Sequence, residues 1–277
     1  MIPIRDALRS QRFPIVTVTL IVLNLLVFLY QGYLGNRPAV LIDLRPWSEA
    51  HLTPPVLDAR TYNAYVRSTG DTVHYPVAAA DAFVMQYGLV PAEVSSGRDL
   101  PPTIPVPIWL TLITSMFLHG GLLHVLGNML YLWVFGDNVE GAMGRGRFLA
   151  FYFLCGMAAG LAQLALSLHS PVPQIGASGA IAGVLGAYFM LFPTSRILTI
   201  IPIFFFIRLI SIPAVVVLGI WFLLQVANSA LSGASGGGVA WFAHIGGFAA
   251  GMVLVLVFRR RDVPIGLLAL LRRRTSV

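Results

Sequence analysis

The feature that most constrains this chain is a set of long stretches that contain no charged side chain. Residues 100–136, 148–195 and 209–258 lack Asp, Glu, Lys and Arg, and a shorter run of this kind covers residues 13–36. About 20 apolar residues in a helix cross the hydrocarbon core of a bilayer. Because these runs are too long for barrel strands, and lipid cannot satisfy backbone polar groups, they predict membrane-spanning helices.

The composition excludes several classes of protein. Hydrophobic residues make up 57% of the chain and charged residues 10%, whereas soluble domains carry roughly 25% charged residues. A soluble enzyme and a disordered chain are therefore excluded. The net charge of +7 fits basic cytoplasmic loops better than a nucleic-acid surface, so no nucleic-acid partner is predicted. The one cysteine, Cys155, gives neither a disulfide framework nor a cysteine-based metal site.

Polar or glycine-rich breaks divide the charge-free runs into shorter spans. One break lies at residues 167–174 and another at residues 229–238. We therefore predict an all-α polytopic membrane protein, a six-helix bundle forming one membrane domain over residues 1–277. The predicted spans are 14–30, 118–135, 148–166, 176–192, 212–228 and 239–258.

The arginines alternate along the chain in a way that fits this count. Thirteen of them lie before span 1, after span 6, in the loop between spans 2 and 3, or in the loop between spans 4 and 5. The other five lie in segment 31–108, beside seven acidic residues. Cytoplasmic loops of membrane proteins are enriched in Arg and Lys. This predicts a multi-pass protein of a bacterial cell membrane, with both termini and the basic tail 259–277 in the cytoplasm.

Two connecting segments need their own interpretation. Segment 31–108 is long, polar and rich in proline, and we expect a packed extracytoplasmic insertion, with a flexible linker as the alternative. Segment Ile197–Ile207 is very apolar but short, and lies between Arg196 and Arg208. We expect an interfacial or re-entrant helix there, because a seventh span would place the C-terminal arginines on the wrong side.

Four of the polar side chains inside the predicted spans are candidates for function, because such groups are expensive there. His124 and Asn128 stand four residues apart, so they share one face of span 2. Ser178 lies at the start of span 4 and His244 early in span 6. Spans 2, 4 and 6 run in the same direction, so all four groups fall in the outer half of the bilayer.

These residue types permit nucleophilic acyl transfer. A serine hydroxyl needs a base to take its proton, and histidine is the usual base. The start of a helix favours negative charge, so the Ser178 backbone N–H is a candidate oxyanion donor, together with Asn128 and His124. No acidic residue lies near His244 in any span, so a dyad is predicted rather than a triad.

Simpler interpretations of each residue stand beside this one. A serine in a membrane helix commonly bonds to its own helix, and either histidine could be an ordinary interhelical hydrogen bonder. The pairs Gly179/Gly183 and Gly247/Gly251 could serve packing alone, although close helix approach is also what would bring Ser178 to His244. The matched depth of all four groups favours the catalytic interpretation.

Taken together, the motifs resemble the rhomboid family of intramembrane serine proteases. The matching residues are Gly176-Ala-Ser-Gly179, His124-x-x-x-Asn128 with His119 before it, Glu140-x-x-x-Gly144, and Ala243-His244-x-x-Gly247-x-x-x-Gly251. They occur in the family's order over about residues 109–258.

The resemblance implies a role for each of these positions. Ser178 would be the nucleophile, His244 the base, and Asn128, His124 and the Ser178 backbone the oxyanion site. Gly176, Gly179, Gly247, Gly251 and His119 would be structural, and Glu140 would tie the cytoplasmic end of span 2. Substrates would be membrane proteins cut in a transmembrane helix near the outer face of the bilayer, without a metal or cofactor.

Two positions depart from the family pattern, and two other functions stay open. Leu110 stands after Trp109 where the family often has arginine, and Ala182 stands where many members have an aromatic residue stacked on the catalytic histidine. One alternative is an inactive rhomboid-like protein that binds membrane clients. The other is a solute or proton carrier, although the sequence offers no intramembrane carboxylate near the histidines and no visible inverted repeat.

Overall fold

The computed structural model describes residues 2–8, 12–69, 74–203, 206–232 and 240–267. Arg9, Arg272–Arg274, most of the break predicted at 229–238 and the start of the last predicted span at Val239 lie outside the described residues.

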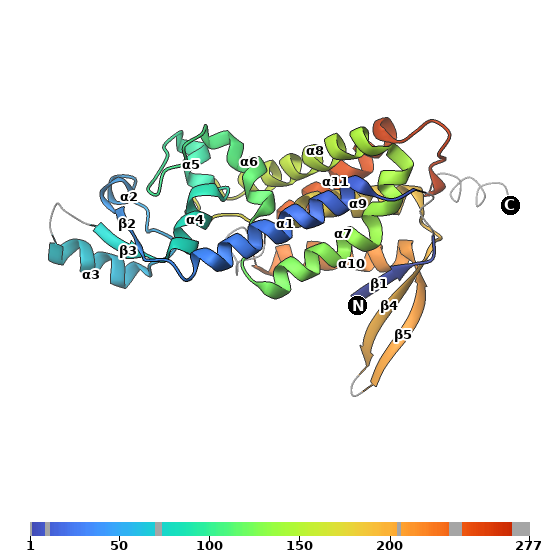
Figure 1. Cartoon of the computed structure of the whole chain (residues 1–277), viewed down its shortest axis with the longest axis horizontal. Helices are drawn as coiled ribbons and strands as arrows, with labels where there is room; N and C mark the ends of the chain where they lie inside the picture. The colour runs from blue at the N-terminus through green and yellow to red at the C-terminus, as the bar shows by residue number, and fades with distance from the viewer. Residues whose placement is uncertain (1, 9–11, 70–73, 204–205, 233–239, 268–277) are drawn as a thin grey trace.

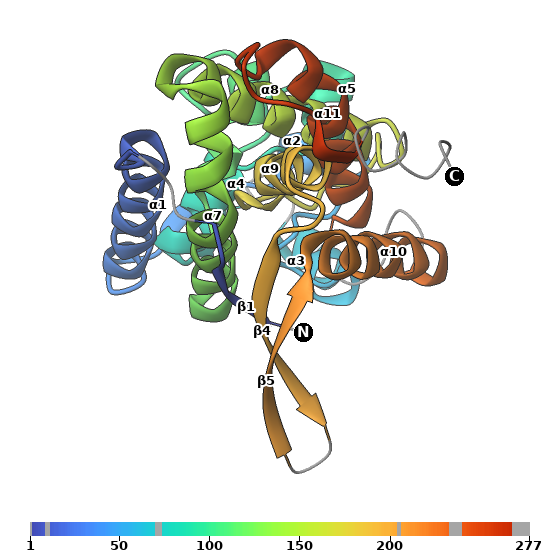
Figure 2. The ribbon, with the colours of Figure 1, turned by 90° about the vertical axis from the view of Figure 1, so that its right-hand side faces the viewer.

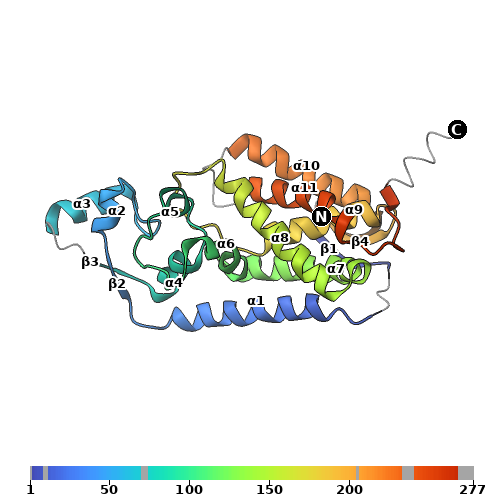
Figure 3. The ribbon, with the colours of Figure 1, turned by 90° about the horizontal axis from the view of Figure 1, so that it is seen from above.

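The centre of the molecule is a bundle of long helices (Figures 1 and 3). Their bounds are α1 Ile15–Leu34, α7 Leu122–Met143, α8 Arg145–Leu164, α9 Ser178–Leu191, α10 Ala214–Ser232 and α11 Trp241–Phe258. Seen along the bundle, α9 lies in the middle, with α7, α8, α10 and α11 around it (Figure 2). All residues of α9 except Ser178 and Phe189 are buried. Its neighbours therefore shield this helix from lipid.

The chain is a multi-pass integral membrane protein with four to five candidate spans among its described residues. The helices α1, α8, α10 and α11 are each long and apolar enough to cross a bilayer. A fifth candidate joins the segment Ile108–Phe117 to α7 across a bend of 84°. The one predicted span left over, the fourth, corresponds to α9, which has 14 residues and is about 21 Å long. That is shorter than the roughly 30 Å core of a bilayer, so a count of six spans stays a prediction.

The segment between α1 and α7 folds into a packed insertion at one end of the bundle (Figure 1). Its elements are β2 Val40–Asp43, α2 Arg45–Glu49, α3 Ala59–Thr69, β3 His74–Val77, α4 Ala79–Tyr87, α5 Pro91–Ser96 and α6 Thr111–Thr114, with 3₁₀ turns at Ile108–Leu110 and Ser115–Phe117. Strands β2 and β3 pair antiparallel. Trp47 is fully buried in a separate apolar cluster, and its Nε1 donates to the Pro101 carbonyl at 2.8 Å. The described part of this segment is therefore a packed insertion, as expected.

A buried acid shows how closely the insertion is packed. Glu93 in α5 is 4% exposed and accepts a hydrogen bond from the Leu100 N–H at 3.2 Å. Desolvation by burial outweighs that hydrogen bond and raises the pKa of Glu93 to about 8. A carboxyl group in open solvent would not be shifted in this way.

The expectation of an interfacial helix over Ile197–Ile207 is wrong. The segment forms an antiparallel hairpin of β4 Arg196–Ile203 and β5 Phe206–Pro213, which projects from the side of the bundle (Figure 2). The N-terminal strand β1, Ile2–Asp6, adds to β4 and gives the sheet order β1-β4-β5. Isoleucine and phenylalanine are frequent here and favour strands. Strand β1 lies almost 200 residues from β4 along the sequence, so the local sequence does not predict their pairing.

Two carboxylates, from Asp6 and Glu140, hold the N-terminal segment against the helices at the end of the molecule opposite the insertion. The Asp6 carboxylate of β1 accepts hydrogen bonds from the Asn138 side chain, at 2.9 Å, and from the Tyr188 hydroxyl. Burial raises the pKa of Asp6, since desolvation outweighs the hydrogen bonds from the Tyr188 hydroxyl and the Leu8 N–H. Glu140 of α7 accepts from the Val16 N–H at 3.1 Å and from the Thr17 N–H and hydroxyl at 2.8 and 2.9 Å. The start of α1 is thereby held against the end of α7.

The arginine-bearing connections gather at the end opposite the insertion, which we call the arginine end. It includes Arg145 at the start of α8, Arg196 at the start of β4, and Arg259 after α11. Strand β1 and the end of α11 also lie there (Figures 1 and 3). The helices thus run in alternating directions, as the arginine pattern predicts.

Candidate active site

Ser178 is the first residue of α9, and the chain turns sharply just before it. Gly176 has φ +118°, a conformation that L side chains rarely adopt, and its N–H donates to the Ser115 carbonyl at 2.9 Å. No side chain caps the start of α9. The first N–H groups of the helix therefore face the region around Ser178, where they favour a negative charge.

His244 meets Ser178 across the interface of α9 and α11. Its Nε2 lies 2.8 Å from the Ser178 Oγ, which is hydrogen-bonding distance. Both side chains are half-buried. The sequence places these residues 66 positions apart, and the structure brings them together as predicted. A hydroxyl and an imidazole in this arrangement have the geometry of a nucleophile and its base.

Glycines allow the two helices to come so close. A Cβ on Gly247 would lie 2.1 Å from the Gly179 carbonyl oxygen, and one on Gly251 would lie 2.0 Å from the Gly183 carbonyl oxygen. These are backbone atoms, which cannot rotate away as a side chain can. The glycine pairs singled out in the sequence therefore set the distance between α9 and α11.

His124 lies beside Ser178, on the first turn of α7. A Cβ on Gly176 would lie 2.9 Å from the His124 Nε2 and 3.7 Å from the Ser178 Oγ, so both groups flank the same glycine. Asn128, one turn further on, is buried, and its Nδ2 donates to the His124 carbonyl at 3.1 Å. His124 is exposed and therefore accessible, while the Asn128 amide is engaged within its own helix.

His119 has a supporting place in this arrangement. It is buried, and its ring lies edge-on to His124 with the ring centres 5.0 Å apart. Its backbone pairs with the Gln31 amide of α1, through hydrogen bonds of 3.1 and 3.2 Å. His119 therefore connects α1 to the turn that precedes His124.

Comparison with known proteins identifies the domain that carries this site. The family model for the Rhomboid domain matches residues 107–261, which is more than half of the chain and includes Ser178, His244, His124 and Asn128. The chain belongs to the rhomboid family.

Individual relatives agree with this assignment. Rhomboid protease GluP of Bacillus subtilis is 36% identical over 53% of this chain and 26% of its own length. Rhomboid protein 1, mitochondrial, of Saccharomyces cerevisiae is 34% identical over 52% of this chain and 40% of its own length. Rhomboid-related protein 2 of Mus musculus is 34% identical over 50% of this chain and 45% of its own length. The chain thus matches less than half the length of each of these relatives.

In this rhomboid, residues that were not predicted from the sequence hold the His244 ring. Ala182, the position where an aromatic residue is often found, is fully buried. The ring instead lies between Trp221 of α10 and Trp241 of α11, with ring centres at 5.9 and 6.2 Å. Gln225 of α10 places its Oε1 2.8 Å from the His244 Nδ1. A polar residue inside a predicted span was the available signal for Gln225.

The other departure, Leu110, lies in the 3₁₀ turn Ile108–Leu110 that precedes α6. Its neighbour Trp109 is 61% exposed. These residues precede the bent segment that leads into α7. They have no hydrogen bond to Ser178 or His244 among the described residues.

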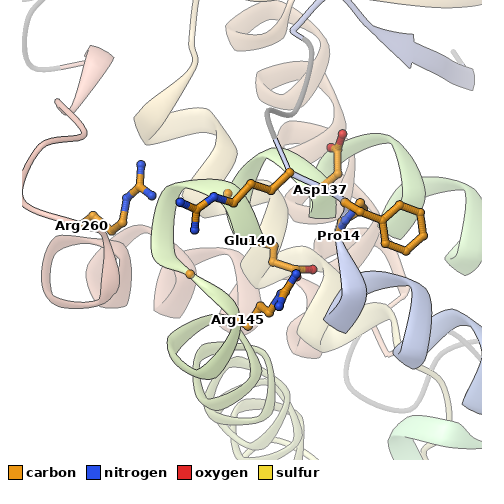
Figure 4. Close-up of a pocket in the computed structure, with 9 residues that line it drawn as sticks. Pro14, Asp137, Glu140, Arg145 and Arg260 are labelled. Atoms are coloured by element: carbon orange, nitrogen blue, oxygen red, sulfur yellow. The ribbon is translucent and has the colours of Figure 1, made fainter.

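Two cavities of this rhomboid differ in size and position. One of about 40 Å³ adjoins Ser178 and is lined largely by small residues, among them Gly156, Gly160, Gly179 and Ala243. A larger one, about 380 Å³, lies at the arginine end between Pro14, Glu140, Arg145 and Arg260 (Figure 4). The larger cavity contains neither Ser178 nor His244, so its size does not mark it as the place of the chemistry.

The described residues contain no group of three or more His, Cys, Asp or Glu side chains placed to hold a metal ion. The donors around Ser178 are a hydroxyl, imidazoles and amides. Such a set suits proton transfer and hydrogen bonding to an oxyanion.

Proposed function

We propose that this rhomboid is an intramembrane serine endopeptidase that cleaves transmembrane segments of other membrane proteins. The observation that carries the proposal is the 2.8 Å contact between the Ser178 Oγ and the His244 Nε2 at the start of a buried helix. The names of the relatives as rhomboid proteases support it.

In the proposed reaction, His244 Nε2 takes the Ser178 hydroxyl proton while the Oγ bonds to a peptide carbonyl carbon. The resulting oxyanion accepts hydrogen bonds from the Ser178 N–H and from His124. Asn128 joins them once its amide leaves the His124 carbonyl. His244 then gives the proton to the leaving amine as the C–N bond breaks, and water hydrolyses the acyl-enzyme. Each oxyanion donor is worth roughly 3 kcal/mol.

The proposal extends to the setting of the reaction. In this proposal, all six helices of the bundle cross the membrane, and residues 1–277 form one membrane domain. The arginine end lies in the cytoplasm of a bacterial cell. Ser178 then lies toward the outer face. Because a helical peptide hides its carbonyls in hydrogen bonds, the substrate helix must unwind before Ser178 can attack.

The test uses the intact protein in proteoliposomes with a reporter carrying one transmembrane helix. We expect Ser178→Ala to abolish cleavage and fluorophosphonate labelling, and His244→Ala to reduce both by at least about a hundredfold, while thermal stability is retained. Cleavage by Ser178→Ala at the wild-type rate would contradict the mechanism. Wild-type protein that captures the reporter without cutting it would favour the client-binding alternative.

A further inference from the structure

We propose that Gln225 is a positioning residue for the reaction, which selects the tautomer of His244 that can act as a base. The inference rests on the proposed function. Gln225 lies outside every motif from which the site was predicted.

The first step is the orientation of the Gln225 amide. Its Nε2 donates to the Trp221 carbonyl, one turn back in α10, at 3.1 Å. The opposite amide orientation would place Oε1 against that carbonyl, two acceptors facing each other. Oε1 must therefore face the His244 Nδ1, which lies 2.8 Å away.

The second step concerns the proton on the imidazole. An amide oxygen only accepts hydrogen bonds, so the His244 Nδ1 must donate. In the neutral ring the other nitrogen, Nε2, then carries the lone pair and accepts from the Ser178 hydroxyl at 2.8 Å. The other tautomer would place two acceptors, Oε1 and Nδ1, in contact and leave Nε2 unable to take a proton.

The third step is the immobility of this arrangement. Gln225 is 7% exposed, so its oxygen has little access to water and needs the partner that His244 supplies. Trp221, four residues earlier on the same face of α10, lies against the ring. One face of α10 thus supplies both the hydrogen bond and the aromatic contact that Ala182 of α9 cannot supply.

The neutral amide of Gln225 acts on His244 differently from a carboxylate at the same position. A carboxylate would stabilise the charged imidazolium that forms as Ser178 loses its proton, whereas an amide oxygen does so more weakly. We therefore expect Gln225 to act mainly by orienting the ring and selecting its tautomer.

The experiment compares three variants for cleavage in proteoliposomes and for the rate of fluorophosphonate labelling at Ser178. Gln225→Met keeps the length of the side chain without an acceptor, Gln225→Glu keeps the acceptor, and Leu224→Met is a control on the exposed side of α10. We expect Gln225→Met to lower kcat and labelling about tenfold to a hundredfold with little change in KM. Gln225→Glu should retain most of both rates.

Other outcomes overturn the proposal in distinguishable ways. Wild-type rates in Gln225→Met would show that the acceptor is dispensable. Equal losses in Gln225→Met and Gln225→Glu, with a lower melting temperature in both, would indicate a structural role only. Wild-type protein that neither cleaves nor labels would instead refute the proposed function, on which Gln225 depends.

Discussion

At the scale of single residues, Glu140 shows how a side chain can serve a helix to which it does not belong. Helix α1 follows Pro14, which offers no capping side chain, and its first N–H groups have no partner within the helix. The Glu140 carboxylate, from α7, accepts from two of them and from the Thr17 hydroxyl. Its negative charge also lies at the positive end of α1.

Glu140→Ala should therefore loosen α1 from the bundle. We expect a loss of about 3 kcal/mol, because a buried charge-assisted hydrogen bond contributes roughly 1.5–3 kcal/mol and its donors would be left unpaired. Thermal unfolding in detergent measures the loss. Glu140→Gln keeps one acceptor and should be intermediate. An unchanged melting temperature for Glu140→Ala would contradict the capping role.

Sequence reasoning at this scale succeeded where a residue type carries chemistry and failed where only contact reveals it. The contact between Ser178 and His244 could be predicted because a hydroxyl and an imidazole at matched depth suggest one reaction. Gln225 could not, since a glutamine in a span does not say which neighbour it faces. The partner depends on how α10 rotates against α11, and this rotation follows from packing.

At the scale of elements, the contact between α9 and α11 depends on the absence of side chains. Gly251 and Gly247 lie against the carbonyl oxygens of Gly183 and Gly179. Because those atoms belong to a helix backbone, an added methyl group must push the helices apart. The separation of Ser178 from His244 would grow with it.

Gly251→Ala tests this dependence. We expect a loss of about 2 kcal/mol or more in stability and a loss of about a hundredfold in cleavage, since a displacement of about 1 Å at a reacting pair has that effect. Gly219→Ala in α10 is the matched control, because its Cβ would meet nothing within 4 Å. Equal activity in the two variants would disprove the steric argument.

Helices and strands could be predicted where the sequence pattern that marks them lies within the element itself. All six predicted spans coincide with helices, because apolar composition alone marks them. The prediction of an interfacial or re-entrant helix where the β4–β5 hairpin lies is wrong, because a short apolar run has the same composition in either form. Strand β1, which pairs with β4, lies almost 200 residues earlier in the chain, a separation that no local pattern reports.

At the scale of the whole molecule, the insertion and the arginine end define two opposite faces. The proposed orientation places the insertion outside the cell. Cys155, the one cysteine of the chain, is buried, so a thiol reagent should find little background. This allows orientation to be measured with single introduced cysteines.

Arg98→Cys, in the insertion, and Arg147→Cys, at the arginine end, both replace exposed residues. We expect a membrane-impermeant maleimide to label Arg98→Cys in intact cells and Arg147→Cys only after the cells are permeabilised. Labelling in the reverse order would invert the orientation. Unaltered wild-type protein serves as the control for reaction at Cys155.

The position of α9 inside the ring of its neighbours has a consequence for bilayers of different thickness. Hydrophobic mismatch acts on helices that touch lipid, by tilting them or deforming the bilayer around them. Since its neighbours surround α9, a thicker or thinner membrane alters the depth of the outer helices before that of Ser178. A substrate helix has no such shelter and follows the lipid. Under the proposed function, the bond presented for cutting would therefore shift along the substrate as membrane thickness changes, although the protein itself is unchanged.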